Sequence, residues 1–396
     1  MKPALYGVLP RPPHPSRDGL AIRNYHLLEA LAARFEVRAF SLLDPERAYG
    51  GGEVPPGVAV EWIPQRTRRL RRAGALARSL ATGRAYSELL YASGELARRV
   101  AAACAARRPA WVVAHAYHVA PLALASGARV WIDFHNLDSQ IWERVAATGS
   151  SAPRRAFAGL QAPRVRRLEG SLVRAAAGSS CVSRGDAEAL AALGPAAPPL
   201  VVPNGVDLGR YTLRGAPPRA ETIVFVGDLS WPPNAEGVAW FAKSVWPRVR
   251  AARPDATVEV VGRDAPSALT ALGGERFVFA GEGGDTRPVW ARAAVAIVPL
   301  LAGGGTRLKV LEAAACGAPV VATAVGAEGL DLSDAEIRRA DRPEDFAAAV
   351  VGLLADPEAA RRQAAAARAR VEAAYGWAAI GRAFAAELSR RAEERA

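Results

Sequence analysis

The amino-acid sequence predicts an α/β fold with two doubly wound parallel sheets, each covered by helices on both faces. Three observations lead to this prediction. Short apolar runs alternate with segments of helical periodicity, as strands and crossover helices do in parallel sheets. This alternation begins anew after a Pro- and Gly-containing stretch in the middle of the chain. The length of 396 residues is sufficient for two domains with separate cores.

The first series of elements fills the N-terminal half. It opens with the buried strand "ALYGVL" (4–9), a Pro-rich loop to Gly19 and a helix from about 20 to 34. Further strands are predicted where short apolar runs are followed by polar residues. They are "EVRAF" (36–40), "WVVAHA" (111–116), "VWIDFH" (130–135) and "SSCVS" (179–183).

The second series repeats this plan and supplies the second sheet. Its predicted strands are "TIVFVGD" (222–228), "TVEVVG" (257–262), "FVFAGE" (277–282), "VAIVPL" (295–300) and "PVVAT" (319–323), and helices are predicted at 236–252 and 287–294. The boundary falls in "PPLVVPNGVDLGRY" (198–211), where prolines and an Asn-Gly turn follow a strand. We therefore expect domains at 1–205 and 206–376.

Charge and cysteine content narrow the class of protein. The net charge is +12, and residues 1–205 hold 27 Lys+Arg against 15 Asp+Glu, whereas residues 206–396 hold 24 of each. The three cysteines are far apart and have no metal-ligand spacing, which argues against a disulfide framework and favours the cytoplasm. We expect no signal peptide and no membrane span, because the apolar runs are too short for either.

The stretch "GGGTRLKVLEAAACGAPVVAT" (303–323) is the strongest candidate for a binding site. Its helix follows a parallel strand, at the edge where α/β sheets bind ligands and where helix N-termini attract anions. The site residues expected here are Gly304, Gly305, Thr306, Arg307, Lys309 and Glu312. Glycines allow close backbone approach to a phosphate, and Thr306 can cap the helix or donate to that phosphate. Glu312 can bind a pair of ribose hydroxyls, so the set suits a sugar nucleotide; the alternative is a plain strand-to-helix connection.

Other common chemistries lack their motifs. The sequence contains no GxGxxG after the first strand, no Walker motif, no GxSxG, no HExxH and no Asp-x-Asp metal pair. Aromatic residues make up 7% of the chain and no RNA-binding motif is present, so nucleic acid is not expected as a partner.

Four segments resemble glycosyltransferase family 4, whose members are retaining enzymes of the GT-B fold. They are 17–31, 201–211, "FVGDLSWPPNAEGVAWF" (225–241) and "GGGTRLKVLEAAACGAPVVATAVGAEGL" (303–330). The resemblance implies two Rossmann-like domains facing a cleft, and a last helix (377–396) that returns to the N-terminal domain. It also implies transfer of a hexose from a UDP or GDP sugar, held by the C-terminal domain, to a glycan, lipid-linked or small-molecule acceptor. No metal and no cofactor are implied, and the expected role is cell-surface polysaccharide or glycolipid synthesis.

The resemblance assigns roles to several residues. Glu312 matches the family glutamate that contacts the donor ribose, His115 matches the histidine near the donor sugar, and Gly19 matches the glycine that approaches the donor phosphates. Two features depart from the family. Gly304 stands where many members have a first glutamate, and "GDLSWPPN" (227–234) lacks the cations that many relatives place there. Arg307 and Lys309 either replace that charge or are ordinary helix-surface cations.

Weaker candidates and other classes stay open. A half-buried structural histidine is the alternative for His115, His118 is expected to be structural or exposed, and His135 either contacts the acceptor or is structural. Arg23 is expected at the surface, where arginines usually lie. The alternative functions are a GT-B 2-epimerase and a non-catalytic binding protein.

Residues 66–80, "RTRRLRRAGALARSL", resemble a membrane-surface helix. Leu70, Ala73, Ala77 and Leu80 share one helical face, and six arginines surround it. Basic amphipathic helices of this kind bind anionic membrane surfaces. The pattern predicts peripheral contact with the inner face of the plasma membrane, and the alternative is a solvated helix in an Arg-rich protein.

Overall fold

The structure is a computed structural model that describes residues 2–15, 18–44, 53–65, 68–149, 151–213, 215, 218, 221–281, 284–303 and 305–394. The chain forms two compact units. Unit 1 comprises Met1–Pro203 together with Ala378–Ala396, and unit 2 comprises Asn204–Trp377.

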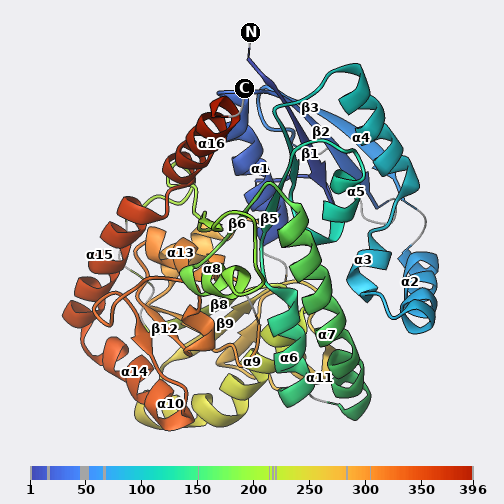
Figure 1. Cartoon of the computed structure of the whole chain (residues 1–396). Helices are drawn as coiled ribbons and strands as arrows, with labels where there is room; N and C mark the ends of the chain where they lie inside the picture. The colour runs from blue at the N-terminus through green and yellow to red at the C-terminus, as the bar shows by residue number, and fades with distance from the viewer. Residues whose placement is uncertain are drawn as a thin grey trace. The chain divides into compact units, whose positions relative to one another are not determined.

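Unit 1 is built on a parallel sheet whose described strands number seven, in the order β3-β2-β1-β4-β5-β6-β7 (Figure 1). The strands are β1 (Ala4–Leu9), β2 (Glu36–Leu43), β3 (Val58–Pro64), β4 (Trp111–Ala114), β5 (Val130–Phe134), β6 (Gly178–Cys181) and β7 (Leu200–Val201). Each neighbouring pair is parallel, with Gly7 of β1 opposite Ala39 of β2 and Val113 of β4. Parallel pairing requires crossover connections, and the helices provide them.

Helices cover both faces of this sheet. They are α1 (Gly19–Ala32), α2 (Arg68–Thr82), α3 (Tyr86–Leu90), α4 (Gly94–Ala106), η1 (Tyr117–Val119), α5 (Ala120–Leu124), α6 (Asp138–Thr148), α7 (Ala152–Ala175), α8 (Arg184–Ala191) and α16 (Trp377–Glu393). Figure 1 shows α16 beside α1, and a Cβ added at Gly381 would lie 2.5 Å from the Cβ of Ala30. Trp111 Nε1 also donates to the Leu388 carbonyl at 2.9 Å, so α16 is fastened to the sheet.

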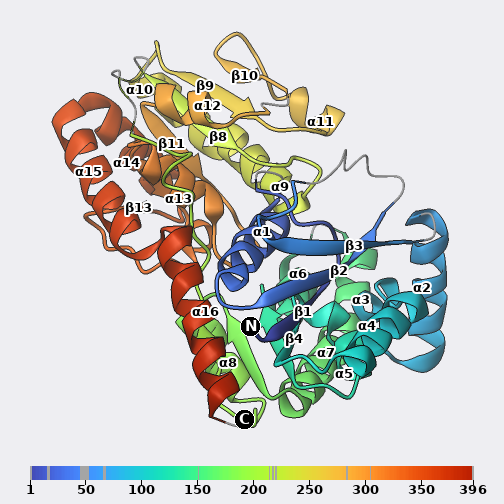
Figure 2. The same ribbon diagram turned by 90° about the horizontal axis from the view of Figure 1, so that it is seen from above.

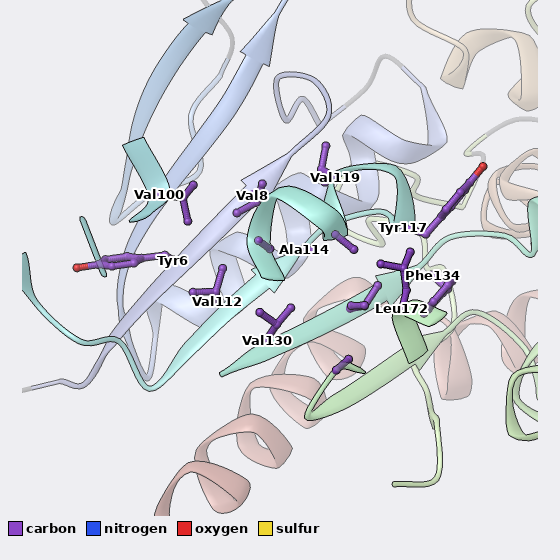
Figure 3. Packing of buried hydrophobic residues seen from close by; sticks show 14 of the residues in the cluster. Tyr6, Val8, Val100, Val112, Ala114, Tyr117, Val119, Val130, Phe134 and Leu172 are labelled. Carbon is purple, nitrogen blue, oxygen red and sulfur yellow. The ribbon is translucent and has the colours of Figure 1, made fainter. Parts of the chain in front are cut away.

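The alternation of side chains along the strands separates the two faces. Tyr6, Val8, Val112, Ala114 and Val130 point to one face, where Figure 3 shows them with Val100, Val119 and Leu172 from the covering helices. The residues between them, such as Trp111 and Asp133, point to the face covered by α1 and α16. Period-2 alternation dictates this split, and it places Arg23 of α1 opposite Asp133.

Unit 2 contains a parallel sheet with six described strands in the order β10-β9-β8-β11-β12-β13 (Figure 2). The strands are β8 (Thr222–Val226), β9 (Thr257–Val261), β10 (Phe277–Phe279), β11 (Val295–Val298), β12 (Val320–Ala322) and β13 (Arg338–Arg339). The helices are α9 (Pro232–Trp240), the π-helical turn η2 (Phe241–Val245), α10 (Trp246–Ala252), α11 (Ser267–Thr270), α12 (Arg287–Arg292), α13 (Leu308–Ala315), η3 (Val325–Ala327), α14 (Pro343–Ala355) and α15 (Pro357–Ala374). Buried clusters fill both faces of the sheet.

The predicted fold class is therefore confirmed, since both sheets are parallel and covered on both faces. Three strands were not predicted in this form: β3, the short β7 and the short β13. The helix predicted at 236–252 is interrupted by the π-helical turn η2, which separates α9 from α10. Residues 206 and 376 form an isolated parallel bridge inside unit 2, and the Val206 amide donates to the Tyr375 carbonyl at 2.8 Å.

Candidate functional site

The strand order of unit 2 reverses between β8 and β11, because β9 and β10 extend the sheet on one side and β12 and β13 on the other. Ligands of open α/β sheets bind at such a switch point, at the carboxyl ends of the strands. The loop after β8 is 227–231, and the loop after β11 leads into the Gly-rich stretch and α13. The predicted donor residues therefore lie at the switch point.

Lys309 places its ammonium at the carboxyl end of β8. Its Nζ donates to Asn234 Oδ1 at 2.9 Å and lies 4.2 Å from the centroid of the Phe225 ring. A Cβ added at Gly227 would come within 2.7 Å of Nζ, so the glycine after β8 leaves the space that the ammonium occupies. The Lys309 ammonium therefore lies in the loop after β8 (227–231), whose own sequence contains no Lys or Arg.

The partners of Lys309 are neutral. Within the described part of the chain it makes no ion pair, and Glu312 acts on it only at longer range. Burial, reinforced by the nearby Arg307 charge, lowers the pKa of the Lys309 ammonium to about 7. The hydrogen bond to Asn234 and the contact with the Phe225 ring hold the Lys309 ammonium against the end of β8, so the helix-surface alternative does not describe Lys309.

Arg307 has a different environment. Its side chain is 8% exposed, its Nε donates to the Val325 carbonyl at 3.0 Å, and its Nη2 lies 3.5 Å from Glu328 Oε2. The guanidinium therefore fastens the turn after β12 and is partly neutralised there. It too is no helix-surface cation.

Glu312 lies one turn along α13 from Lys309. Its Oε2 accepts a hydrogen bond from Trp290 Nε1 at 3.3 Å, and its carboxylate accepts one from the hydroxyl of Tyr211. The Tyr211 hydroxyl is also 3.1 Å from Thr286 Oγ1, which fixes its position. Glu312 is half-buried, and this burial raises the pKa of its carboxyl. The two donors hold the carboxylate in one orientation.

The entrance to α13 differs from the prediction in one respect. The helix begins at Leu308 with Arg307 at the N-cap position, and no side chain caps it, so the capping role predicted for Thr306 is wrong. Thr306 is 9% exposed and its Oγ1 has no hydrogen-bond partner among the described residues. Gly303 and Gly305 have φ of 140° and 71°, values that other residues rarely adopt. Gly304 lies outside the described residues.

Unit 1 holds a buried polar cluster at the carboxyl end of β5. Arg23 Nε and Nη2 both donate to the Asp133 carboxylate at 2.8 Å, and both side chains are fully buried. Ser180 Oγ donates to Asp133 Oδ1 at 2.6 Å. Burial alone would raise the pKa of Asp133, but the Arg23 charge and its hydrogen bonds hold that pKa well below its ordinary value. The surface position predicted for Arg23 is wrong, because α1 lies against the sheet face that carries Asp133.

Two histidines follow the strands beside this cluster. His115 is fully buried, and neither ring nitrogen has a hydrogen-bond partner in the described part of the chain. Burial lowers the pKa of His115 to about 4, so the ring is neutral at neutral pH. His135 is nearly buried, with its Nε2 3.3 Å from Asp133 Oδ2. Both imidazoles therefore lie at the same sheet edge as the Arg23 and Asp133 pair.

The remaining predicted positions of unit 1 are less distinctive. Gly19 is exposed and is the first residue of α1, whose N-cap is Asp18; Asp18 Oδ1 accepts from the Ala21 amide at 3.1 Å. His118 stacks on Tyr91 with ring centroids 4.6 Å apart, which is a structural role. Phosphate binding by Gly19, at the N-terminus of α1, remains a proposal.

Both units of the chain match known protein families. Residues 18–205 match the family model for the glycosyl transferase 4-like domain, and residues 220–356 match the model for glycosyl transferases group 1. The chain belongs to glycosyltransferase family 4. The resemblance of the sequence to this family is thereby confirmed.

Curated relatives are similar to this family 4 chain over part of their length. Glycogen synthase of Mycobacterium tuberculosis is 29% identical over 198 residues, which are 47% of this chain and 47% of the relative. Phosphatidyl-myo-inositol mannosyltransferase of Mycolicibacterium smegmatis is 29% identical over 191 residues, 45% of this chain and 48% of the relative. The chain thus spans about half the length of the curated relatives that it matches.

Solved structures resemble the family 4 chain over nearly its whole length. Sucrose-phosphate synthase from Thermosynechococcus elongatus has a TM-score of 0.75 at 19% identity, over 99% of this chain and 100% of that one. The Anabaena protein HepE in complex with UDP and glucose has a TM-score of 0.69 at 16% identity, over 98% and 100%. At these identities the likeness shows the fold alone, which is GT-B.

Four residues of the unit 2 site of this family 4 chain were not assigned from the sequence: Tyr211, Gly227, Trp290 and Asn234. Gly227, Asn234 and Tyr211 all lie in segments that resemble the family, but nothing in their spacing shows that they meet Lys309 and Glu312. Trp290 precedes Glu312 by 22 residues and carries no motif. Only the packing of α12 against α13 brings it to the carboxylate.

The described residues offer neither a metal-binding cluster nor a membrane-spanning helix. Among the residues described above, no three His, Cys, Asp or Glu side chains gather in a way that could hold a metal ion. None of the helices in the described ranges has the length and apolar character needed to span a bilayer.

Proposed function

We propose that the chain is a retaining hexosyltransferase that moves a hexose from a UDP or GDP sugar to an acceptor hydroxyl without a metal ion. The observation that carries this proposal is the Lys309 ammonium, a partly buried cation whose described partners are an amide oxygen and an aromatic ring. A buried cation without a counterion is costly, and a diphosphate would supply the missing charge. Its place at the switch point of the unit 2 sheet supports a nucleotide ligand.

The neighbouring groups fit the rest of the donor. The Glu312 carboxylate is held in place by Trp290 and Tyr211, and we assign it to the two ribose hydroxyls. The unpartnered Thr306 hydroxyl and the amides of 305–309 are assigned to the phosphates, together with Lys309 and the partly neutralised Arg307. UDP is bound by the similar structure of HepE, which supports a uridine nucleotide.

Unit 1 is assigned to the acceptor side of the reaction. His115 remains the proposed catalytic residue there, as a neutral imidazole that hydrogen-bonds a sugar hydroxyl, and Gly19 is proposed to approach a phosphate. In the transfer itself, the bond from C1 to the diphosphate oxygen breaks, the acceptor oxygen bonds to C1 on the same face, and its proton passes to the leaving diphosphate. Groups that stabilise charge on the diphosphate then accelerate the step.

The proposal is tested by incubating the purified protein with a panel of UDP and GDP sugars and measuring nucleoside diphosphate release, with and without EDTA. We expect release with at least one hexose donor, unchanged by EDTA, and a product that retains the anomeric configuration by NMR. Conversion of the sugar nucleotide to its 2-epimer would favour the epimerase alternative. Nucleotide binding without any turnover would favour a non-catalytic binding protein.

Replacing Glu312 by alanine should weaken donor binding at least tenfold, because hydrogen bonds to a charged group contribute about 1.5 to 3 kcal/mol. Isothermal calorimetry with UDP and GDP measures the effect. Glu275→Ala is a matched control, since Glu275 is exposed and in the same unit. A nucleotide without both ribose hydroxyls, a 2′,3′-dideoxynucleotide, should bind Glu312→Ala and wild type with similar affinity. An unchanged affinity of Glu312→Ala for the ribonucleotide would contradict the assignment.

We also propose that α2 contacts an anionic membrane surface, which would bring the enzyme to lipid-linked or polysaccharide acceptors at the inner face of the plasma membrane. Leu70, Leu76 and Leu80 are 67%, 40% and 57% exposed, whereas Ala75 and Ser79 are buried against the unit. The apolar stripe predicted from the sequence thus points away from the core, and Arg69, Arg72 and Arg78 lie near it. The lipid mannosyltransferase among the relatives supports a lipid-linked acceptor.

Vesicle sedimentation tests this membrane contact. We expect binding to phosphatidylglycerol vesicles at low salt, loss of that binding at high salt, and no binding to phosphatidylcholine, because each cation contributes roughly 1 kcal/mol near an anionic surface. Replacing Leu70, Leu76 and Leu80 together by serine should abolish it and leave donor hydrolysis unchanged. Equal sedimentation of this variant and wild type would remove the proposal and favour a soluble acceptor.

A further inference from the structure

Trp231 is an exposed tryptophan in the loop after β8, at the carboxyl end of the strands of the unit 2 sheet. Its side chain is 51% exposed, while the other eight tryptophans are buried or half-buried. Among all aromatic side chains that the structure describes, Trp231 alone is exposed. Covering an indole removes a large apolar area from water, so leaving it uncovered forgoes a substantial stabilisation. Its position therefore calls for a partner that covers it.

The loop that carries Trp231 is held in place by hydrogen bonds of Asp228 and Asn234. Asp228 Oδ1 accepts from the Ser230 amide at 2.9 Å and from its hydroxyl at 2.6 Å, and Asp228 Oδ2 accepts from Arg263 at 3.0 and 2.7 Å. Asn234 Nδ2 donates to the Asp228 carbonyl at 2.8 Å. An aromatic ring on a loop fixed in this way loses little conformational freedom when a ligand binds.

The same loop adjoins the proposed donor site. Trp231 is the N-cap residue of α9, and its carbonyl accepts from the amide of Asn234, the residue that holds Lys309. Helix α9 packs closely on the segment after β11, since a Cβ at Gly237 would lie 2.5 Å from the Pro299 carbonyl. Two residues beyond Pro299, Leu301 is 45% exposed. Exposed apolar side chains thus occur on both loops of the switch point, next to the charged groups assigned to the diphosphate.

We propose that Trp231 determines substrate specificity by stacking its indole on the apolar face of the pyranose ring that reacts at this site. This inference rests on the proposed function. One face of many pyranose rings presents several C–H groups, whose small positive charge matches the negative face of an aromatic ring. Gly304 has replaced the carboxylate that many family members use for sugar hydroxyls, so an apolar contact supplies the discrimination that a charged group supplies elsewhere. The ring belongs either to the donor hexose or to a sugar acceptor.

The test separates the sugar from the nucleotide. Trp231→Ala should leave the affinity for the nucleoside diphosphate alone unchanged by calorimetry. It should raise the KM of one sugar substrate roughly tenfold or more, the size of loss that alanine substitution causes where an aromatic side chain stacks on a nucleobase. Trp231→Phe, which keeps an aromatic face, should restore most of the loss. Val278→Ala is the matched control, because Val278 is 47% exposed on β10 at the far edge of the sheet, and it should change nothing.

The arms of the experiment identify the ring. A weaker affinity for the sugar nucleotide but not for the nucleoside diphosphate assigns the stacking to the donor hexose, and a raised KM for the acceptor alone assigns it to the acceptor. The proposal is overturned if Trp231→Ala changes neither the affinity for the sugar nucleotide nor the KM for the acceptor. It is also overturned if the variant loses affinity equally for the sugar nucleotide and for the nucleoside diphosphate. If the wild type binds nucleotide but transfers no sugar, the proposed function fails, and the ratio of the two affinities in Trp231→Ala still tests the stacking.

Discussion

Replacing Lys309 by methionine is expected to lower kcat/KM for the sugar nucleotide roughly a hundredfold or more, because the groups that stabilise charge in a transition state each contribute about that factor. Methionine keeps most of the volume of the lysine stem, so the packing around Phe225 should survive. Of Arg307 and Lys309, the two cations of the site, only Lys309 lacks an anionic partner in the described structure. Its ammonium lies at the carboxyl end of β8. The affinity for the nucleoside diphosphate should fall as well, by calorimetry.

Lys243→Met is the matched control. Lys243 is an exposed lysine in the π-helical turn of the same unit, and its replacement should leave kinetics and affinity unchanged. Circular dichroism and thermal unfolding of both variants establish that unit 2 is intact. Wild-type kinetics in a folded Lys309→Met protein would disprove the role of this ammonium and remove the main support for the proposed function.

The same residue predicts how donor binding depends on pH. Burial and the Arg307 charge set the pKa of free Lys309 at about 7, and Glu312 opposes them weakly. A bound diphosphate favours the charged ammonium and raises that pKa, so binding above pH 7 takes up a proton. The affinity for the sugar nucleotide, whose diphosphate does not titrate in this range, should therefore fall as pH rises from 7 to 9. Lys309→Met should lose this dependence, and calorimetry in buffers of different ionisation enthalpy measures the proton uptake.

Replacing Asp133 by alanine is expected to destabilise the protein by about 3 to 5 kcal/mol, because it leaves a fully buried guanidinium without its counterion. Arg23 and Asp133 are both fully buried and share two hydrogen bonds of 2.8 Å. Urea unfolding followed by tryptophan fluorescence measures the loss. Removing both charges, as in Arg23→Met with Asp133→Leu, should recover much of the stability, since a well-packed apolar pair avoids the desolvation cost.

Glu36→Gln serves as the control for this buried pair. Glu36 lies in the same unit and pairs with Arg107 at 2.7 Å, but the two side chains are 65% and 47% exposed. Solvent screens such pairs, so no resolvable change in the unfolding midpoint is expected. If Asp133→Ala proved as stable as Glu36→Gln, the buried pair would not be a structural anchor of unit 1.

The alternating strands and helices were predictable because their apolar runs are local in sequence. "ALYGVL", "TIVFVGD" and "VAIVPL" all form central strands, since buried parallel strands read as continuous apolar runs. Strand β3, "VAVEWIP", lies at the sheet edge, where only part of its surface is buried, and its pattern is correspondingly weak. Strands β7 and β13 have two residues each, which is too short for any periodicity.

The site was predictable in part. The Gly-rich stretch and Glu312 follow a strand directly, so their place at the sheet edge follows from local sequence. The neutral surroundings of Lys309 could not be predicted from local sequence. Asn234 and Phe225 lie 75 and 84 residues away and contact Lys309 only because β8 and β11 are neighbours in the sheet. Arg23 was placed at the surface for a related reason: its counterion on β5 is 110 residues distant, and a lone arginine on a helix carries no sign of burial.

The bridge between Val206 and Gly376 has a consequence for the order in which the protein is made. Unit 2 is an insertion in unit 1, and its two ends are hydrogen-bonded to each other inside it. During synthesis the inserted unit is therefore complete as soon as residue 377 has left the ribosome. Unit 1 begins first but must wait for α16, whose Phe384 and Leu388 cover Trp131 and Trp111. Until then α16 is missing from the sheet face that it shares with α1, so a chain truncated after residue 377 should hold a complete unit 2 while its unit 1 still exposes apolar surface to chaperones.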